Sequence, residues 1–187
     1  ISVEGYFDNG LKNGEWATFT EEGKLFSIGF YLNDYKDGVW KYFYKSGYLK
    51  SEGIYSTGFK NGQWIFFYEN KNIDEIGSYY NDLKDGLWGR FYSNGQLKQE
   101  ELYNKGKLIS ISEYYLENGK IADKGNFKNG KGDVFDYYEN GKIFSIKNYN
   151  NGFLNGKSIF YYSNGKIAEE GNYKNNIKVG VWKKYNK

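Results

Sequence analysis

The sequence contains no cysteine, histidine, proline or methionine. Without cysteine there is no disulfide, no thiolate nucleophile and no sulfur-ligated metal. Without histidine there is no Ser-His-Asp triad, no Cys-His pair and no imidazole-ligated zinc. Because the chain does not begin with methionine, we expect a processed or trimmed piece of a protein, either cytoplasmic or exported after loss of an N-terminal leader.

The sequence also lacks an excess of one charge. Lys and Arg number 26 against 23 Asp and Glu, a net charge of +3, and Arg90 is the single arginine. This balance argues against a nucleic-acid partner, whose binding depends on phosphate neutralisation. No apolar run reaches the roughly 18 residues of a membrane-spanning helix. Abundant Lys, Asn, Ile and Tyr with so little Pro and Arg favour an AT-rich bacterial genome.

Aromatic residues, by contrast, make up 21% of the chain and recur in one phrase. KDGVWKYFYKSG at 36–47 returns as KNGQWIFFYENK at 60–71 and as KDGLWGRFYSNG at 84–95. The lead residue of each repeat is spaced by 24 residues, with one spacing of 22. We therefore predict a single array over residues 1–187 with about seven and a half repeats. They start near Gly5, Gly29, Gly53, Gly77, Glu101, Gly125, Lys147 and Gly171.

Each repeat predicts a β-hairpin. The tract 39–44 is β-branched or aromatic and bounded by glycine, and 48–55 alternates with period two, so both predict strands. Asn140-Gly141 and Asn94-Gly95 predict a tight turn with a left-handed residue, and a looser turn should lead into the next repeat. No helical periodicity is present. The predicted fold class is all-β: an elongated, single-layer antiparallel meander of hairpin repeats without helices.

A single layer of hairpins has no thick core, so we expect aromatic columns along the array to stabilise it. Glycines should leave room for rings of adjacent strands to lie across the backbone. One predicted column contains Phe19, Phe43, Phe67, Phe91, Tyr115, Tyr137 and Tyr161; a second contains Leu25, Leu49, Ile73, Leu97, Ile121, Ile143 and Ile167; a third contains Phe7, Tyr31, Tyr55, Tyr79, Tyr103, Phe127, Tyr149 and Tyr173.

The tracts Asn61-Gly62-Gln63-Trp64 and Asp85-Gly86-Leu87-Trp88, each followed by aromatics, resemble MORN repeats, and most of all the bacterial MORN-variant repeats. The resemblance covers essentially the whole chain. It implies an elongated, twisted, single-layer antiparallel sheet. It leaves function open, because the family includes membrane-associated scaffolds, protein-binding modules and proteins described as antitoxins.

Tryptophan is distributed unevenly. Trp16, Trp40, Trp64 and Trp88 form an unbroken ladder, whereas Ser112, Val134 and Ser158 replace Trp in the next three repeats. The indoles either pack the sheet or bind a partner. Since the later repeats tolerate their loss, we predict a partner-binding surface, because clustered Trp and Tyr are enriched at binding hot spots. It consists of Trp40, Trp64, Trp88, Tyr44, Tyr68 and Tyr92, which should share a strand face by alternation.

Catalysis is not expected. The recurring pairs Asp34/Asp37 and Asp82/Asp85 lie in solvated turns, where Asp serves turn formation. No loop is acidic enough for a calcium site, so no metal and no cofactor are expected. We predict a non-catalytic, monomeric, bacterial MORN-variant repeat protein that acts as a protein-protein interaction scaffold. Two alternatives stay open: an aromatic-strip module for cell-wall or host glycans at the cell surface, and an antitoxin-like protein that sequesters a toxin. Membrane lipid has weaker support, because the lysines are dispersed along the turns.

Overall fold

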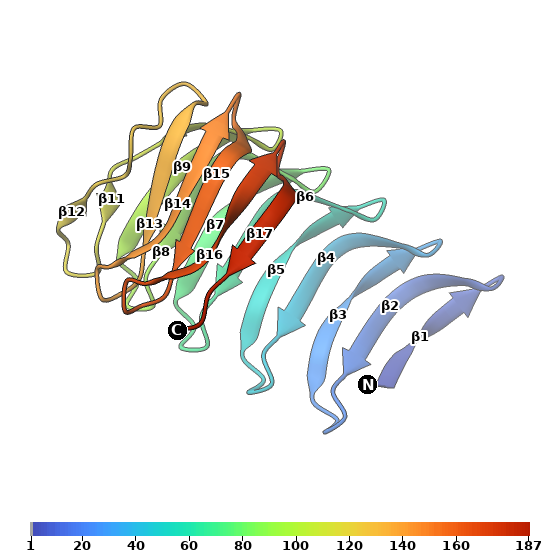
Figure 1. Cartoon of the computed structure of the whole chain (residues 1–187). Coiled ribbons are helices and arrows are strands. Elements are labelled where there is room, and N and C mark those ends of the chain that lie inside the picture. The colour runs from blue at the N-terminus through green and yellow to red at the C-terminus, as the bar shows by residue number, and fades with distance from the viewer. Residues whose placement is uncertain (1) are drawn as a thin grey trace. The chain divides into compact units, whose positions relative to one another are not determined.

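The computed structural model describes residues 2–187, and these residues contain strands and turns but no helix (Figure 1). The strands are β1 (Ser2–Asp8), β2 (Leu11–Phe19), β3 (Leu25–Leu32), β4 (Tyr35–Phe43), β5 (Leu49–Ser56), β6 (Phe59–Phe67), β7 (Ile73–Tyr80), β8 (Leu83–Phe91), β9 (Leu97–Asn104), β10 (Lys107–Ile111), β11 (Tyr114–Tyr115), β12 (Ile121–Ala122), β13 (Gly132–Tyr137), β14 (Ile143–Asn150), β15 (Phe153–Tyr161), β16 (Ile167–Lys174) and β17 (Ile177–Lys184).

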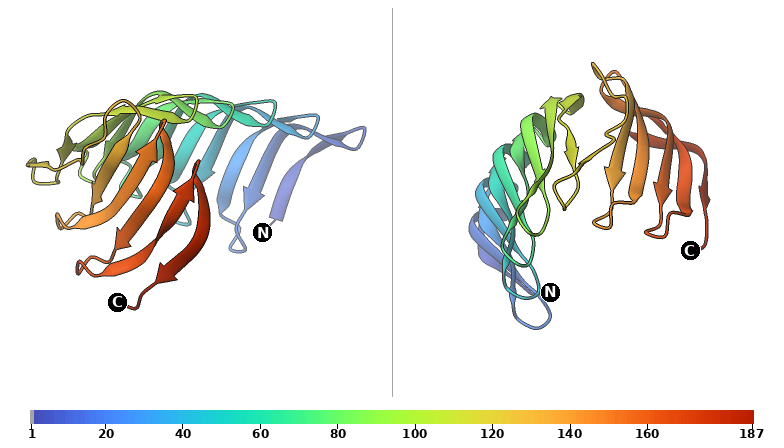
Figure 2. Two further views of the ribbon diagram at one scale, coloured as in Figure 1. Left: turned by 45° about the horizontal axis from the view of Figure 1, so that its top comes forward. Right: turned by 90° about the vertical axis from the view of Figure 1, so that its left-hand side faces the viewer.

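The chain divides into an N-terminal unit, Ile1–Gly95, and a C-terminal unit, Gln96–Lys187. In the N-terminal unit each strand from β1 to β8 pairs antiparallel with the next, so the strands form one layer (Figure 2). In the C-terminal unit β9 pairs with β10, β11 with β12, and β13 to β17 follow in order. The all-β meander of hairpin repeats is thus confirmed, and one continuous array over residues 1–187 stays a prediction.

The first turn of each hairpin has the predicted form. Thr20 donates its N–H to the Lys24 carbonyl at 2.8 Å, and Gly23 donates to the Thr20 carbonyl at 3.0 Å. Gly23 has φ +75°, a conformation that glycine adopts without a steric penalty. The same left-handed position recurs at Gly47, Gly95, Gly119, Gly141 and Gly165, and Lys71 takes it in the third hairpin with φ +74°.

The second turn was predicted to be loose, and that prediction is wrong. Asn33 and Asp34 connect β3 to β4 with φ values of +50° and +68°, the paired left-handed conformation of a two-residue hairpin turn. Asn and Asp tolerate this conformation better than other side chains. The Asp34 carboxylate also accepts the backbone N–H of Lys12 at 2.7 Å. Asp82 does the same for Lys60 at 2.8 Å, so these acids hold successive turns together.

A buried indole layer lies on one face of the N-terminal unit. We call the face that carries Trp16, Trp40, Trp64 and Trp88 the front face, and the opposite one the back face. Each ring covers the glycine eleven residues before it: a Cβ added at Gly53 would lie 2.2 Å from an atom of the Trp64 ring. The predicted role of glycine in giving rings space is therefore borne out at these positions.

The three predicted columns differ in burial. Tyr31, Tyr55 and Tyr79 of the third column pack edge-on against the indoles; Tyr55 and Trp64, for example, have centroids 5.2 Å apart. The first two columns pair across the hairpin ends, as Phe43 does with Leu49, and most of their members are only half-buried. The buried large side chains described in the N-terminal unit are instead the four tryptophans, which are 0–5% exposed, and Tyr92, which is 1% exposed. In the C-terminal unit, Leu108, Phe127 and Val134 form a small apolar cluster.

Candidate functional site: the two faces of the N-terminal unit

The structure places the predicted tryptophans inside the sheet's aromatic layer. Trp40, Trp64 and Trp88 are 2%, 1% and 0% exposed. Their indole N–H groups donate to backbone carbonyls ten residues earlier: Trp40 to Phe30 at 2.9 Å, and Trp64 to Ile54 at 3.1 Å. The pairing register of the two strands shifts at these carbonyls. Opposite the shift, on the neighbouring strand, lies the glycine of the Asn/Asp-Gly-x-Trp motif, such as Gly62, which has a left-handed conformation. The indole therefore completes a bulge in the sheet.

The predicted tyrosines have a different position from the one that alternation gave. β4 ends at Phe43, and the register shifts between Tyr42 and Phe43. Tyr42, which the prediction omitted, lies two residues after Trp40 on the same face of β4 and stacks on it with centroids 6.1 Å apart. The Tyr44 hydroxyl instead donates to the Phe67 carbonyl at 2.6 Å.

The other two predicted tyrosines also lie in hairpin ends. The Tyr68 hydroxyl donates to the Phe91 carbonyl at 2.9 Å, and Tyr92 is 1% exposed. Tyr68, like Tyr44, thus ties its hairpin to the next one. The contact surface of Trp40, Trp64, Trp88, Tyr44, Tyr68 and Tyr92 stays a prediction; the three tryptophans and Tyr92 are buried, whereas Tyr44 and Tyr68 are half-buried.

A row of lysines covers the indoles on the front face. The lysine four residues before each tryptophan places its Nζ over the ring. The distances to the ring centroid are 4.7 Å for Lys12, 4.2 Å for Lys36, 4.4 Å for Lys60 and 4.1 Å for Lys84. Such cation–π contacts contribute about 0.5–1 kcal/mol at exposed sites. The sequence contains the signal, a lysine that opens each K-N/D-G-x-W phrase, but from the sequence alone these lysines are only charges dispersed along the turns.

Burial shifts the pKa values of the groups in this row. Lys36 donates to the Tyr42 hydroxyl at 2.7 Å, and Tyr42 shares a 3.1 Å hydrogen bond with Tyr55. Desolvation lowers the pKa of Lys36, and repulsion by Lys60 and Lys12 adds to that effect. Desolvation, with smaller contributions from its bond to Tyr55, raises the pKa of Tyr42. Desolvation and the nearby Glu75 raise the pKa of Tyr79 to about 12.

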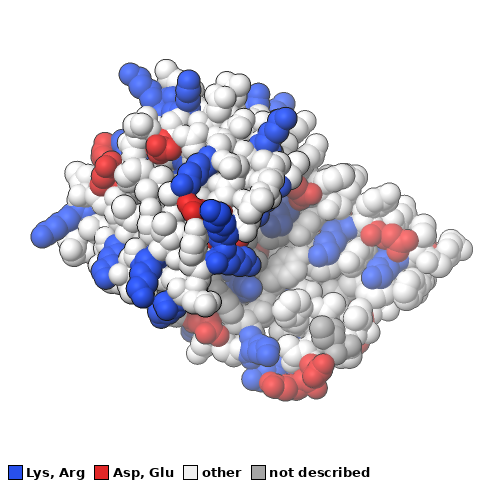
Figure 3. Space-filling view, viewed as in Figure 1, with Lys and Arg blue, Asp and Glu red and all other residues white. Residues whose placement is uncertain are grey.

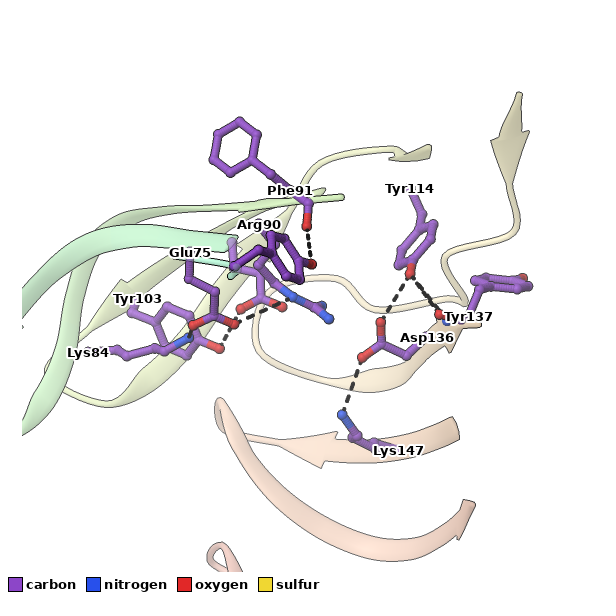
Figure 4. Close-up of polar contacts among 11 residues, drawn as sticks. Glu75, Lys84, Arg90, Phe91, Tyr103, Tyr114, Asp136, Tyr137 and Lys147 are labelled. Atoms are coloured by element: carbon purple, nitrogen blue, oxygen red, sulfur yellow. Dashed lines mark hydrogen bonds and ion pairs between the residues drawn. The ribbon is translucent and has the colours of Figure 1, made fainter. Parts of the chain in front are cut away.

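The row ends in an ion-paired cluster near β8. Glu75 lies 3.3 Å from the Lys84 amine and 3.8 Å from the Arg90 guanidinium (Figure 4). Lys84 therefore has a carboxylate partner. Lys12, Lys36 and Lys60 take part in no ion pair within residues 2–187.

The back face of the N-terminal unit exposes apolar side chains. Phe30, Val39, Ile54 and Leu87 are 52%, 53%, 44% and 58% exposed. Val39 and Ile54 are direct cross-strand partners. Phe30 and Val39 also line a shallow hollow with Ile28. We call Phe30, Val39, Ile54 and Leu87 the back-face apolar strip, which the polar pair Gln63 and Ser78 on β6 and β7 interrupts before Leu87.

In the C-terminal unit, a polar cluster joins side chains from β11, β13 and β14. The Tyr114 hydroxyl donates to Asp136 at 3.2 Å, and Lys147 lies 3.5 Å from the other Asp136 oxygen (Figure 4). Tyr114 is fully buried and Asp136 is 7% exposed. This cluster lies where the tryptophans are missing from the repeats.

The described residues contain no cluster of acidic side chains suited to a metal ion. Nor does any helix within residues 2–187 meet the length and hydropathy needed to cross a membrane. On the face shown in Figure 3, Lys and Arg are dispersed, with Asp and Glu among them.

The comparison with family models agrees with the repeat geometry. The MORN repeat variant model matches seven times, at residues 12–33, 36–56, 60–82, 84–105, 108–129, 131–151 and 154–175. The chain belongs to the MORN repeat variant family. MORN repeats are generally modules that bind proteins or membranes, and proteins built from them are typically non-enzymatic. No curated protein matches the chain.

Proposed function

We propose that this MORN repeat protein is a non-catalytic protein-interaction scaffold of bacterial origin that binds its partner through the back-face apolar strip. The observation that carries the proposal is the exposure of Phe30, Val39, Ile54 and Leu87 on one face of a single-layer sheet. Exposed apolar patches on soluble proteins mark interaction surfaces. A cognate toxin is one such partner, so an antitoxin-like role is a special case of this proposal.

The alternative of a glycan-binding strip loses its main support. It required exposed indoles, since sugars stack on open aromatic faces, and the front-face indoles are covered by lysine and tyrosine side chains. Catalysis has no support from the front-face tyrosines, because a hydroxyl with a raised pKa stays protonated at neutral pH and is a poor base.

The test compares two double variants of the full chain. Val39→Ser with Leu87→Ser removes exposed apolar area from the strip. The control, Ile177→Ser with Val181→Ser, changes side chains that are 68% and 79% exposed in the C-terminal unit. We expect both variants to melt within a few degrees of the parent, since surface changes usually alter stability by less than about 0.5 kcal/mol.

Binding is measured first by capture from the source cells and then by calorimetry with the purified captured protein. We expect the strip variant to lose at least about tenfold in affinity, and the control to stay within about twofold. Equal binding by the parent and the strip variant would refute the assignment of the strip.

A further inference from the structure

The front face of the N-terminal unit carries a charge arrangement that the back-face proposal does not use. Lys12, Lys36 and Lys60 lie at equivalent positions of successive repeats, and none of them has an ion-pair partner in residues 2–187. Two acids lie near the turns and bind the backbone: Asp34 accepts the N–H of Lys12, and Asp82 accepts that of Lys60. Desolvation lowers the pKa of the Lys60 amine, and the charge of Asp82 offsets part of that effect. We propose that this lysine row is a binding site for an acidic α-helix of a partner protein.

The amines are held in place before any ligand arrives. Each lies over an indole ring, at 4.7, 4.2 and 4.4 Å for Lys12, Lys36 and Lys60. The Lys36 amine also donates to Tyr42 at 2.7 Å. A pre-ordered and partly desolvated cation loses less conformational entropy and hydration on binding than a free surface lysine does. Desolvation, and then repulsion by Lys60 and Lys12, lowers the pKa of Lys36, and a bound anion relieves this repulsion.

The distance between neighbouring lysines in the row determines which shape of acidic peptide can contact all three amines. Equivalent lysines are two strands apart, which corresponds to about 9.4–9.8 Å across the sheet. In an α-helix, residues seven apart lie on one face about 10.5 Å from each other. In an extended strand, residues on one face are only about 6.8 Å apart. A helix that crosses the strands with Asp or Glu at i, i+7 and i+14 therefore meets all three amines, and an extended acidic peptide does not.

The back face discriminates against the same ligand. Glu15 and Asp37 both pair with Phe30 across neighbouring strands, so they lie on the back face, and Glu52 pairs there with Lys41. An acidic helix is repelled by Glu15 and Asp37, whereas Lys41 offsets the charge of Glu52. The same helix is attracted to the lysine row. The two faces can consequently hold two different partners. The proposal for the lysine row does not depend on the proposal for the back-face apolar strip.

The experiment uses the full chain and a labelled synthetic helix of 22 residues, rich in alanine and glutamine, with Glu at every seventh position. A peptide of the same composition with Glu at unrelated positions is its control. Affinity is measured by fluorescence anisotropy at low and high salt. We expect the heptad peptide to bind at least about tenfold more tightly than its control, and binding to weaken as salt rises.

Substitutions locate the site. Lys36→Gln with Lys60→Gln should weaken binding of the heptad peptide by about tenfold, since each partly exposed ion pair contributes up to about a factor of five. Lys41→Gln with Lys50→Gln removes two charges outside the lysine row, one beside Glu52 and one over the Tyr44 ring, and should change binding by less than about twofold. Lys36→Arg should retain binding, which separates lost charge from lost structure. Near-UV circular dichroism, dominated by the indoles under the amines, verifies that each variant is folded.

Three results would overturn the proposal: equal weakening by both double variants, equal affinity for the two peptides, or no peptide binding at low salt. Vesicles containing phosphatidylglycerol serve as a further arm. Binding to such vesicles that depends on Lys36 and Lys60, without binding of the heptad peptide, would replace the acidic helix with an anionic membrane surface.

Discussion

In the N-terminal unit, a glycine such as Gly53 lies under the indole eleven residues later, Trp64. In the C-terminal unit, Lys147 takes the glycine position and Ser158 takes the tryptophan position, and these two are direct cross-strand partners. Glu101 and Ser112 make the same double replacement. Gly171 and Trp182, near the end of the chain, again form the glycine–indole pair, because a Cβ added at Gly171 would lie 2.3 Å from an atom of the Trp182 ring.

In both units, therefore, each tryptophan packs on the glycine eleven residues before it, and the two residues form one packing unit. A side chain at Gly53 would collide with the ring, so the indole requires glycine. Once serine replaces the indole, the position is free to carry a long side chain, and Lys147 uses the space to reach Asp136. In the repeats that start at Glu101 and Lys147 both positions changed together, whereas the repeat that starts at Gly125 keeps its glycine although Val134 replaces the indole. An indole therefore requires glycine at the paired position, but glycine does not require the indole.

The largest expected effect comes from breaking this element in the N-terminal unit. Trp64→Ala should lower the free energy of unfolding by about 3–5 kcal/mol, as for other buried large-to-small changes. Gly53→Ala should cost about 1–3 kcal/mol, because the added methyl group displaces the ring. Urea unfolding of the full chain measures both changes.

The coupling between the two substitutions is the sharper test. In the Trp64→Ala background, Gly53→Ala should cost close to nothing, because the ring it displaces is gone. Strictly additive effects of the two substitutions would mean that glycine is needed here for another reason, such as its backbone conformation.

A smaller effect concerns serines at equivalent positions of the two units. Ser27 shares a 2.7 Å hydrogen bond with Thr18, whereas the Ser145 hydroxyl is fully buried with no partner in residues 2–187. Ser27→Ala should cost about 0.5–1.5 kcal/mol. Ser145→Ala should leave stability unchanged or raise it by up to about 1 kcal/mol, since it removes an unpaired polar group. Equal losses in thermal melting would indicate that a water molecule satisfies Ser145.

The sequence predicted features that depend on neighbours in the chain. The period, the hairpins and the need for glycine beneath a ring all follow from residues within about one repeat of each other. It did not predict which aromatics would be buried, because the shift between Tyr42 and Phe43 breaks the alternation that placed Tyr44 beside Trp40. Nor did it predict the lysine row, because an amine over an indole has the same sequence pattern as a solvated turn lysine.

The smallest expected effect concerns a hairpin that departs from its counterparts in both units. Lys71 has φ +74°, whereas glycine occupies the equivalent turn position at Gly47 in the N-terminal unit and Gly141 in the C-terminal unit. A left-handed conformation costs an L-residue about 1–2 kcal/mol. The Lys71 amine recovers part of that cost by lying 4.7 Å from the centre of the Tyr48 ring.

Lys71→Gly should therefore raise the free energy of unfolding by about 0.5–1 kcal/mol, after the greater backbone entropy of glycine in the unfolded chain is included. Two controls separate the contributions, both measured by urea unfolding. Lys71→Ala keeps the strained backbone but removes the cation–π contact, so it should be less stable than the parent. Gly47→Lys introduces the same strain into the preceding hairpin and should lose about as much as Lys71→Gly gains. A loss of stability in Lys71→Gly would show that the contact with Tyr48 outweighs the strain of the turn.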